Sequence, residues 1–120
     1  MNNNQEKNPT QGLKNDQNKL PLGTVIQKQF PNAIEAIAKC SEFGHKKYSE
    51  SDNDWLNYQR IDDAMFRYTN ATIRHFFAEG GDNDKIDKDS SLPHIYQTAW
   101  NAIARLEVYL KNKKENETIS

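Results

Sequence analysis

The stretch from Leu92 to Leu110 constrains the fold more than any other part of this sequence. Apolar residues recur there at alternating spacings of 4 and 3, at positions 92, 96, 99, 103, 106 and 110. This spacing places one apolar stripe along about five turns of α-helix. Pro93 suits a first helical turn, where its missing N–H costs nothing, and lysines follow the stripe, where cations suit the helix dipole. The pattern therefore predicts a helix over residues 91–111.

A second helix is expected over residues 61–78. An apolar stripe runs along it beside a stripe of small residues, which would let another helix approach closely. Two aspartates occupy its first turn, as the helix dipole prefers, and Gly80-Gly81 follows as a stop signal. The loop that follows, residues 79–90, is rich in acidic side chains.

A third helix is expected over residues 31–43. Pro31 is a good first helical residue, and Glu35–Lys39 and Glu42–Lys46 are i,i+4 ion pairs. Gly44 is expected to end or bend this helix. Residues 49–60 then form a polar loop, and no strand pattern appears after residue 30.

The N-terminal 30 residues differ in composition from the rest. Residues 1–11 are amide-rich and predict a disordered tail. From residue 12, scattered apolar side chains favour an extended arm lying over a core, because Pro21 and Gly23 argue against a helix. The division is therefore a tail, a single helical domain over 12–111, and a charged C-terminal tail over 112–120.

Composition makes the predicted core small. Hydrophobic residues are 35% of the 120 residues, and the mean hydropathy is -1.01. A chain this short and polar buries little apolar surface alone, so self-association is expected. We predict an all-α fold, with a three-helix core and an extended N-terminal arm, assembled into an oligomeric helical bundle.

Charge and cysteine content exclude several classes of protein. A net charge of -1 gives no basic field for duplex nucleic acid or an anionic membrane. No apolar run approaches a membrane span and no signal peptide is apparent, so a cytoplasmic location is expected. Cys40 is the one cysteine, which excludes an internal disulfide or a thiolate zinc site and predicts a buried structural thiol. An enzyme and a small-molecule binder remain.

His75 and His94 flank the loop between the helices predicted over residues 61–78 and 91–111, so the two helix ends can meet there. Together with Arg67, Arg74 and Asn101 they would suit phosphate and base recognition, because arginine offers forked donors and asparagine a paired donor and acceptor. The alternative is that the arginines pair with surface acids while the histidines cap or pack. Spacing alone does not separate these two interpretations.

Other candidates carry weaker patterns. Asp87 and Asp89 lie in the acidic loop, where either could bind Mg²⁺ or Mn²⁺, although a solvated loop is the simpler interpretation because the loop lacks the EF-hand order. Lys46 and Lys47 beside Gly44 could hold phosphate, but the sequence around them lacks the G-x-x-x-x-G-K-[ST] pattern of a phosphate-binding loop. Trp100 fits a core or interface better than a stacking platform.

Several short motifs, in order, resemble a known family. Residues 12–22 resemble its G-x-K-x-D-x-G-K opening, residues 33–38 its A-L-E-x-V-A, and residues 43–48 its F-G-x-x-K-Y. Asp54-Trp55 stands where N-W is usual. Further matches are residues 71–75 to A-L-x-R-H, Glu79-Gly80 with residues 89–94 to G-E-x-x-D-x-x-S-G-L-x-H, and residues 99–102 to A-x-W-N-A. The family is a phage family, the dATP/dGTP diphosphohydrolase N-terminal domain.

The resemblance implies an all-α fold related to MazG-like pyrophosphohydrolases. Those enzymes are oligomers that cleave a nucleoside triphosphate to the monophosphate and pyrophosphate, using Mg²⁺ held by acidic side chains. For this chain the resemblance adds Lys14, Asp16 and Lys19 as ligand contacts and places the protein in a host bacterial cytoplasm.

The sequence departs from that pattern at three places. Asn18 replaces a glycine, and residues 81–85 look like an insertion. The E-x-x-E … E-x-x-D metal signature is absent. In the helix predicted over residues 31–43, Glu35 is followed three residues later by Ala38, and Glu42 by His45. A basic pocket with few carboxylates can bind a nucleotide without cleaving it.

Two hypotheses from different classes therefore stand. The first is a Mg²⁺-dependent (or Mn²⁺-dependent) (d)NTP diphosphohydrolase, in which the candidate residues have three roles. Catalytic candidates are Glu35, His75 and His94; metal candidates are Glu35, Glu42 and Asp89; nucleotide contacts are Lys14, Asp16, Lys19, Lys46, Lys47, Tyr48, Trp55, Arg67, Arg74 and Asn101.

The second hypothesis is a metal-independent sponge that sequesters a host nucleotide or a cyclic or ADP-ribose-type immune signal. In it Trp55, Tyr48 or Trp100 stacks on the base. A weaker third interpretation is a structural oligomer built on the 92–110 stripe.

Overall fold

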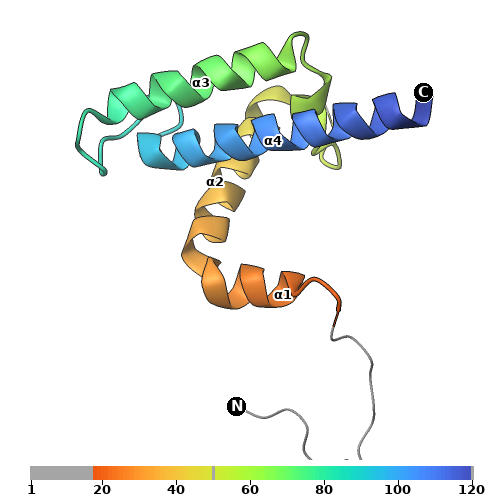
Figure 1. Ribbon diagram of the computed structural model, residues 1–120. Coiled ribbons are helices and arrows are strands. Elements are labelled where there is room, and N and C mark those ends of the chain that lie inside the picture. The colour runs from red at the N-terminus through yellow and green to blue at the C-terminus, as the bar shows by residue number, and fades with distance from the viewer. Residues whose placement is uncertain (1–17, 50, 120) are drawn as a thin grey trace, which may run out of the picture.

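The computed structural model describes residues 18–49 and 51–119, and the described part is helical with no strand (Figure 1). The elements, in chain order, are α1 (Leu22–Thr24), the π-helical turn η1 (Val25–Gln29), α2 (Pro31–Tyr48), the 3₁₀ turn η2 (Asn57–Arg60), α3 (Ala64–Glu79) and α4 (His94–Ile119). The predicted all-α class is confirmed.

Helices α3 and α4 form an antiparallel pair that carries the core (Figure 1). Ala64 and Tyr68 of α3 are buried against Ala104 and Val108 of α4. The alanines leave room for the two backbones to approach, so the small-residue stripe predicted on α3 has the expected use. Gly80 ends α3 in a left-handed conformation with φ of 57°, and its amide donates to the Phe77 carbonyl. This is the stop that the Gly80-Gly81 pair predicted.

Helix α2 crosses the α3–α4 pair and is held by Trp100. The Trp100 indole Nε1 donates to Ser41 Oγ on α2 at 2.8 Å. Its ring packs edge-on against Tyr58 and Tyr68, with centroids 5.7 and 5.8 Å away. Trp100 therefore packs at the core, as predicted. Cys40 is 4% exposed, which confirms a buried thiol.

Several predicted boundaries were wrong. Helix α3 begins at Ala64 rather than residue 61, so Asp62 and Asp63 precede its first turn instead of occupying it. Helix α4 begins at His94 rather than residue 91, directly after Pro93. Helix α2 does not end near Gly44 but continues to Tyr48, and the Ser49 amide still donates to the His45 carbonyl. One glycine costs a helix only about 1 kcal/mol relative to alanine, and the Glu42–Lys46 ion pair spans the position. Helix α4 likewise continues to Ile119 rather than ending at residue 111.

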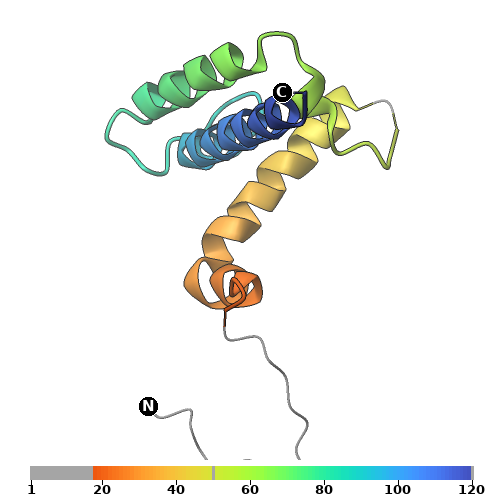
Figure 2. The same ribbon diagram turned by 45° about the vertical axis from the view of Figure 1, so that its right-hand side comes forward.

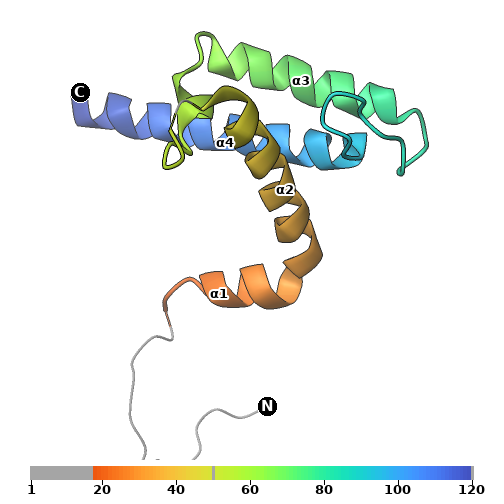
Figure 3. The ribbon, with the colours of Figure 1, turned by 180° about the vertical axis from the view of Figure 1, so that it is seen from behind.

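The predicted extended arm is wrong for residues 22–29, which are helical. Pro21 precedes the first turn rather than interrupting it, and the Val25 amide donates to the Pro21 carbonyl. The described part of the arm does not cover the core: Figures 2 and 3 show α1 and η1 at the far end of α2 from the α3–α4 pair. Leu22, Ile26 and Phe30 are accordingly exposed. The predicted tail over residues 1–11 and the start of the arm lie outside the described residues.

Helix α4 has an inner and an outer face, and the apolar stripe of the sequence lies on the outer one. The face against α3 is built from Gln97, Asn101, Ala104 and Val108, which are all buried. Most of the 92–110 stripe is left exposed, and Leu106 is 54% accessible. The apolar periodicity therefore predicted the helix correctly. It did not predict which face points inward, because the inner face of α4 is more polar than the outer face.

Candidate functional site

A groove of about 1090 Å³ lies between α2, α3 and α4. Ile37, Tyr58 and Tyr68 line it with apolar and aromatic surface. The loop before α4 contributes Asp87 and Asp89. This volume reaches the upper end of the usual range for small-molecule sites, roughly 300–1,000 Å³.

Arg67 and Arg74 give the groove two guanidinium groups from one helix. They are seven residues apart on α3, so they lie on one side of the helix about 10 Å apart along its axis. In the described part of the chain, neither guanidinium makes a hydrogen bond or an ion pair. Arginine presents a rigid fork of donors that matches phosphate oxygens. The two side chains can therefore bind anions without first breaking a protein contact.

The predicted meeting of His75 and His94 is confirmed. Their Nδ1 atoms lie 2.8 Å apart, and their ring centroids are 5.1 Å apart. Such a contact needs one nitrogen to donate a proton and the other to accept it. Burial lowers the pKa of His75, and the charges of His94 and Arg74 lower it further against an opposing pull from Asp87. His75, which lines the groove, therefore favours its neutral form.

Asp87 is the carboxylate that faces this histidine pair. Burial opposes its ionisation, but hydrogen bonds from the Ser90 hydroxyl and the Asp89 amide outweigh it and lower the pKa of Asp87. The same carboxylate lies close enough to α2 to act on Cys40. Burial, with a smaller contribution from Asp87, raises the pKa of the Cys40 thiol to about 11. Cys40 is therefore an unreactive wall residue.

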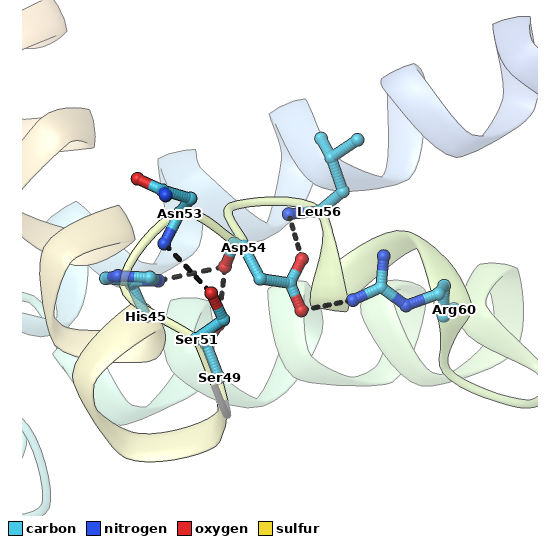
Figure 4. A network of polar contacts seen from close by, with 7 residues as sticks. All are labelled: His45, Ser49, Ser51, Asn53, Asp54, Leu56 and Arg60. Atoms are coloured by element: carbon cyan, nitrogen blue, oxygen red, sulfur yellow. Dashed lines mark hydrogen bonds and ion pairs between the residues drawn. The ribbon is translucent and has the colours of Figure 1, made fainter.

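Trp55 lies at the groove, on the loop after α2. Figure 4 shows the hydrogen bonds of the residues on either side of it. The His45 ring nitrogen Nδ1 donates to the Asp54 carbonyl at 2.9 Å, and the Ser49 hydroxyl donates to the same oxygen at 2.7 Å. The Asp54 carboxylate accepts from the Leu56 amide and pairs with Arg60. Arg60 lowers the pKa of Asp54 against a smaller opposing effect of burial.

These contacts hold the Trp55 ring on the His45 ring. The centroids are 3.9 Å apart with an interplanar angle of 15°, and Trp55 remains 50% exposed. Tyr48, at the end of α2, is exposed beside the same groove. An aromatic ring with one face covered and the surface half exposed is suited to stacking on a planar base.

The three predicted metal ligands do not come together. Their carboxylates are all ion-paired with lysines: Glu35 with Lys39 at 3.6 Å, Glu42 with Lys46 at 3.8 Å, and Asp89 with Lys47 at 2.6 Å. Within residues 18–49 and 51–119 no three His, Cys, Asp or Glu side chains converge on a point that could hold a metal ion. This arrangement does not fit the oxygen-rich site that Mg²⁺ requires.

The structure thus gathers part of the predicted site. Tyr48, Trp55, Arg67, Arg74, His75, Asp89 and Asn101 line the groove. Glu35, Glu42, Lys46, Lys47 and the exposed Lys19 do not line it, and His94 reaches it through His75. Lys14 and Asp16 lie outside the described residues.

Gln97 is a groove residue that the sequence analysis missed. It is 9% exposed on the α3-facing side of α4 and lines the groove. The signal that would have found it is its spacing, one turn before Asn101 on the same face as His94. A polar side chain on the inner face of a helix is unusual enough to single out.

The comparisons with known proteins agree with the motif resemblance. Among the described residues no helix is both long and apolar enough to cross a membrane. No curated protein matches the chain, and no solved structure matches it. The family model described as dATP/dGTP diphosphohydrolase, N-terminal, matches residues 9–118, and the chain belongs to this family.

Proposed function

We propose that this protein binds a purine deoxynucleoside triphosphate in the groove between α2, α3 and α4. The observation that carries this proposal is the pair of guanidinium groups of Arg67 and Arg74, which have no partner in the described part of the chain and lie on the same groove as an exposed aromatic platform. Arginine forks bind phosphate oxygens, and an aromatic ring binds a base by stacking. The family description, which names dATP and dGTP, supports a purine nucleotide as the ligand.

In this proposal the two ends of the nucleotide have different partners. The phosphates contact Arg67 and Arg74, and the free face of Trp55 stacks on the base. His45 supports the opposite face of Trp55 and is itself fixed by the Asp54 carbonyl. Tyr48 closes the platform from the end of α2.

The family description also supports hydrolysis as the activity. The reaction adds water across the bond between the α- and β-phosphates and releases the monophosphate and pyrophosphate. His75 is the group in the groove best suited to accept the proton of that water, because its lowered pKa keeps the imidazole neutral near pH 7. His94 positions the His75 ring through the contact between their Nδ1 atoms.

A non-catalytic sponge is the second candidate, and one observation favours it. Glu35, Glu42 and Asp89, the three carboxylates assigned to the metal, each pair with a lysine instead. Asp87, the other acidic candidate, accepts a hydrogen bond from the Ser90 hydroxyl. Since these residues do not fit the metal, no step of the proposal depends on it. A groove lined by arginines can retain a nucleotide, or a cyclic or ADP-ribose-type signal, without turning it over.

One experiment separates the two candidates. The protein is incubated with dATP, dGTP, cyclic nucleotides and ADP-ribose-type nucleotides, with and without Mg²⁺, and the mixture is chromatographed before and after heat denaturation. Monophosphate and pyrophosphate in equal amounts identify a diphosphohydrolase. A nucleotide peak that disappears and returns unchanged on heating identifies a sponge. If every free nucleotide peak is unchanged throughout, nucleotide binding itself is refuted.

A further inference from the structure

Gln97 places a side-chain amide on the wall of the groove. The residue is only 9% exposed between α3 and α4, yet its amide makes no hydrogen bond within residues 18–49 and 51–119. No side-chain nitrogen or oxygen in the described part is both fully enclosed and without a partner. The Gln97 amide is therefore reached from the groove rather than sealed inside the protein.

Asn101, one turn further along α4, fixes this arrangement. Its side-chain Nδ2 donates to the Gln97 carbonyl oxygen at 2.8 Å. That bond uses one of the two N–H donors of Asn101 and holds the backbone from which the Gln97 side chain extends. The Asn101 Oδ1 atom accepts no hydrogen bond in the described part, and Asn101 also lines the groove. The groove therefore has two neighbouring amide groups with unused hydrogen-bonding capacity.

An unused amide in such a place needs a physical reason. Polar side chains on a mostly buried helix face are nearly always hydrogen-bonded, and an amide that opens onto a groove takes its partners from whatever fills that groove. An apolar side chain on the inner face of α4 would pack against α3 and need no such partner. A ligand that supplies both a donor and an acceptor to the groove would satisfy the amide.

We propose that Gln97 reads the base edge of the bound nucleotide and lets the groove accept both adenine and guanine. This rests on the nucleotide-binding function proposed above. The adenine edge offers an amino donor beside a ring-nitrogen acceptor, whereas the guanine edge offers a carbonyl acceptor beside a ring N–H donor. A carboxamide carries one donor side and one acceptor side, and rotation of the amide by half a turn exchanges them. One glutamine therefore pairs with either purine.

Replacing the neutral Gln97 amide by a carboxylate tests this role. In Gln97→Glu an ionised carboxylate has acceptors and no donor. It retains two hydrogen bonds to guanine, whose ring N–H and exocyclic amino group are adjacent donors, but it opposes the ring-nitrogen acceptor of adenine. Since a good two-point contact to a base is worth about 1–3 kcal/mol of discrimination, the ratio of dGTP to dATP affinity is expected to rise about tenfold or more.

The assay is calorimetric titration of the full chain with dATP, dGTP and tripolyphosphate, in the absence of divalent metal. Gln59→Glu is the matched control, because it makes the same chemical change at a residue that bonds Tyr58 and does not line the groove. The control is expected to leave the purine ratio unchanged. Tripolyphosphate binding is expected to be equal in both variants and the wild type, because the arginines are intact.

The outcomes separate this proposal from the one on which it rests. Wild-type protein that binds neither dATP nor dGTP refutes both. Wild-type binding with an unchanged purine ratio in Gln97→Glu overturns the base-reading role alone. If Gln97→Glu fails to fold, Gln97→Met keeps the shape and removes both hydrogen-bonding groups. It is then expected to lose affinity for both purines about tenfold at unchanged tripolyphosphate affinity, and retained purine affinity contradicts the proposal.

Discussion

Replacing Arg74 by methionine tests the central element of the proposed site. The substitution keeps an unbranched apolar stem and removes the guanidinium. A hydrogen bond to a charged group is worth about 1.5–3 kcal/mol, which corresponds to a loss of about 10- to 150-fold in nucleotide affinity. The fold should hardly change, because within the described residues Arg74 has no hydrogen bond or ion pair to lose. Substitutions of this kind alter stability by about 0.5 kcal/mol, so Tm should shift by no more than about 4 °C.

The measurement is a dGTP titration of Arg74→Met at two salt concentrations, with thermal unfolding of the same samples. Arg105→Met is the matched control. Arg105 donates to Thr69 Oγ1 across the α3–α4 pair and does not line the groove. The control should keep nucleotide affinity, and Arg74→Met should also show a weaker salt dependence because one phosphate contact is missing. Equal affinity of Arg74→Met and wild type would refute the assignment of the phosphates to α3.

Three further predictions follow from other parts of the molecule. Trp100→Phe keeps an aromatic ring but removes the hydrogen bond to Ser41, so urea unfolding should show a loss of about 1 kcal/mol, and an unchanged midpoint would contradict this. Burial lowers the pKa of His75 in the folded state, so the unfolded state binds its proton first as the pH drops. The free energy of unfolding should therefore fall below about pH 6.5. In His75→Gln the urea midpoint should fall less steeply over the same pH range. The exposed outer stripe of α4 predicts that the protein self-associates and that Leu106→Asp shifts it toward monomer in sedimentation velocity, whereas a monomeric wild type would refute this.

The helices were predictable because their signals are local. The 4-and-3 spacing of apolar residues predicted α4, and Gly80-Gly81 predicted the end of α3. The approach of His75 to His94 was also predictable, because one lies near the end of a predicted helix and the other near the start of the next, and the loop between them lets those two ends meet. Each of these inferences needed only residues close together in the chain.

The failures have two causes. One is a contact distant in sequence: the apolar stripe of α4 looks like an inner face by composition, and only the position of α3 shows that the face with Gln97 points inward. The other is the weighing of local signals. Gly44 was interpreted as a helix end or bend from the cost of glycine, although the Glu42–Lys46 pair that spans it is equally local. The arm looked extended because Pro21 and Gly23 were interpreted as breakers rather than as the start of a helix.

The metal prediction shows how two sequence patterns can compete for the same residues. Glu35 and Glu42 were predicted both as partners of lysines one turn away and as ligands of a cation, and the structure contains the lysine pairs. A carboxylate on the exposed side of α2 gains its lysine partner locally, whereas a ligand role needs other carboxylates to approach from other elements. The motifs that do converge come from all three long helices: Tyr48 ends one on α2, Arg74 and His75 end one on α3, and Asn101 belongs to one on α4. Short motifs far apart in this sequence thus supply the walls of one groove, and the chemistry they bring to it is basic, aromatic and amide, which suits holding a nucleotide.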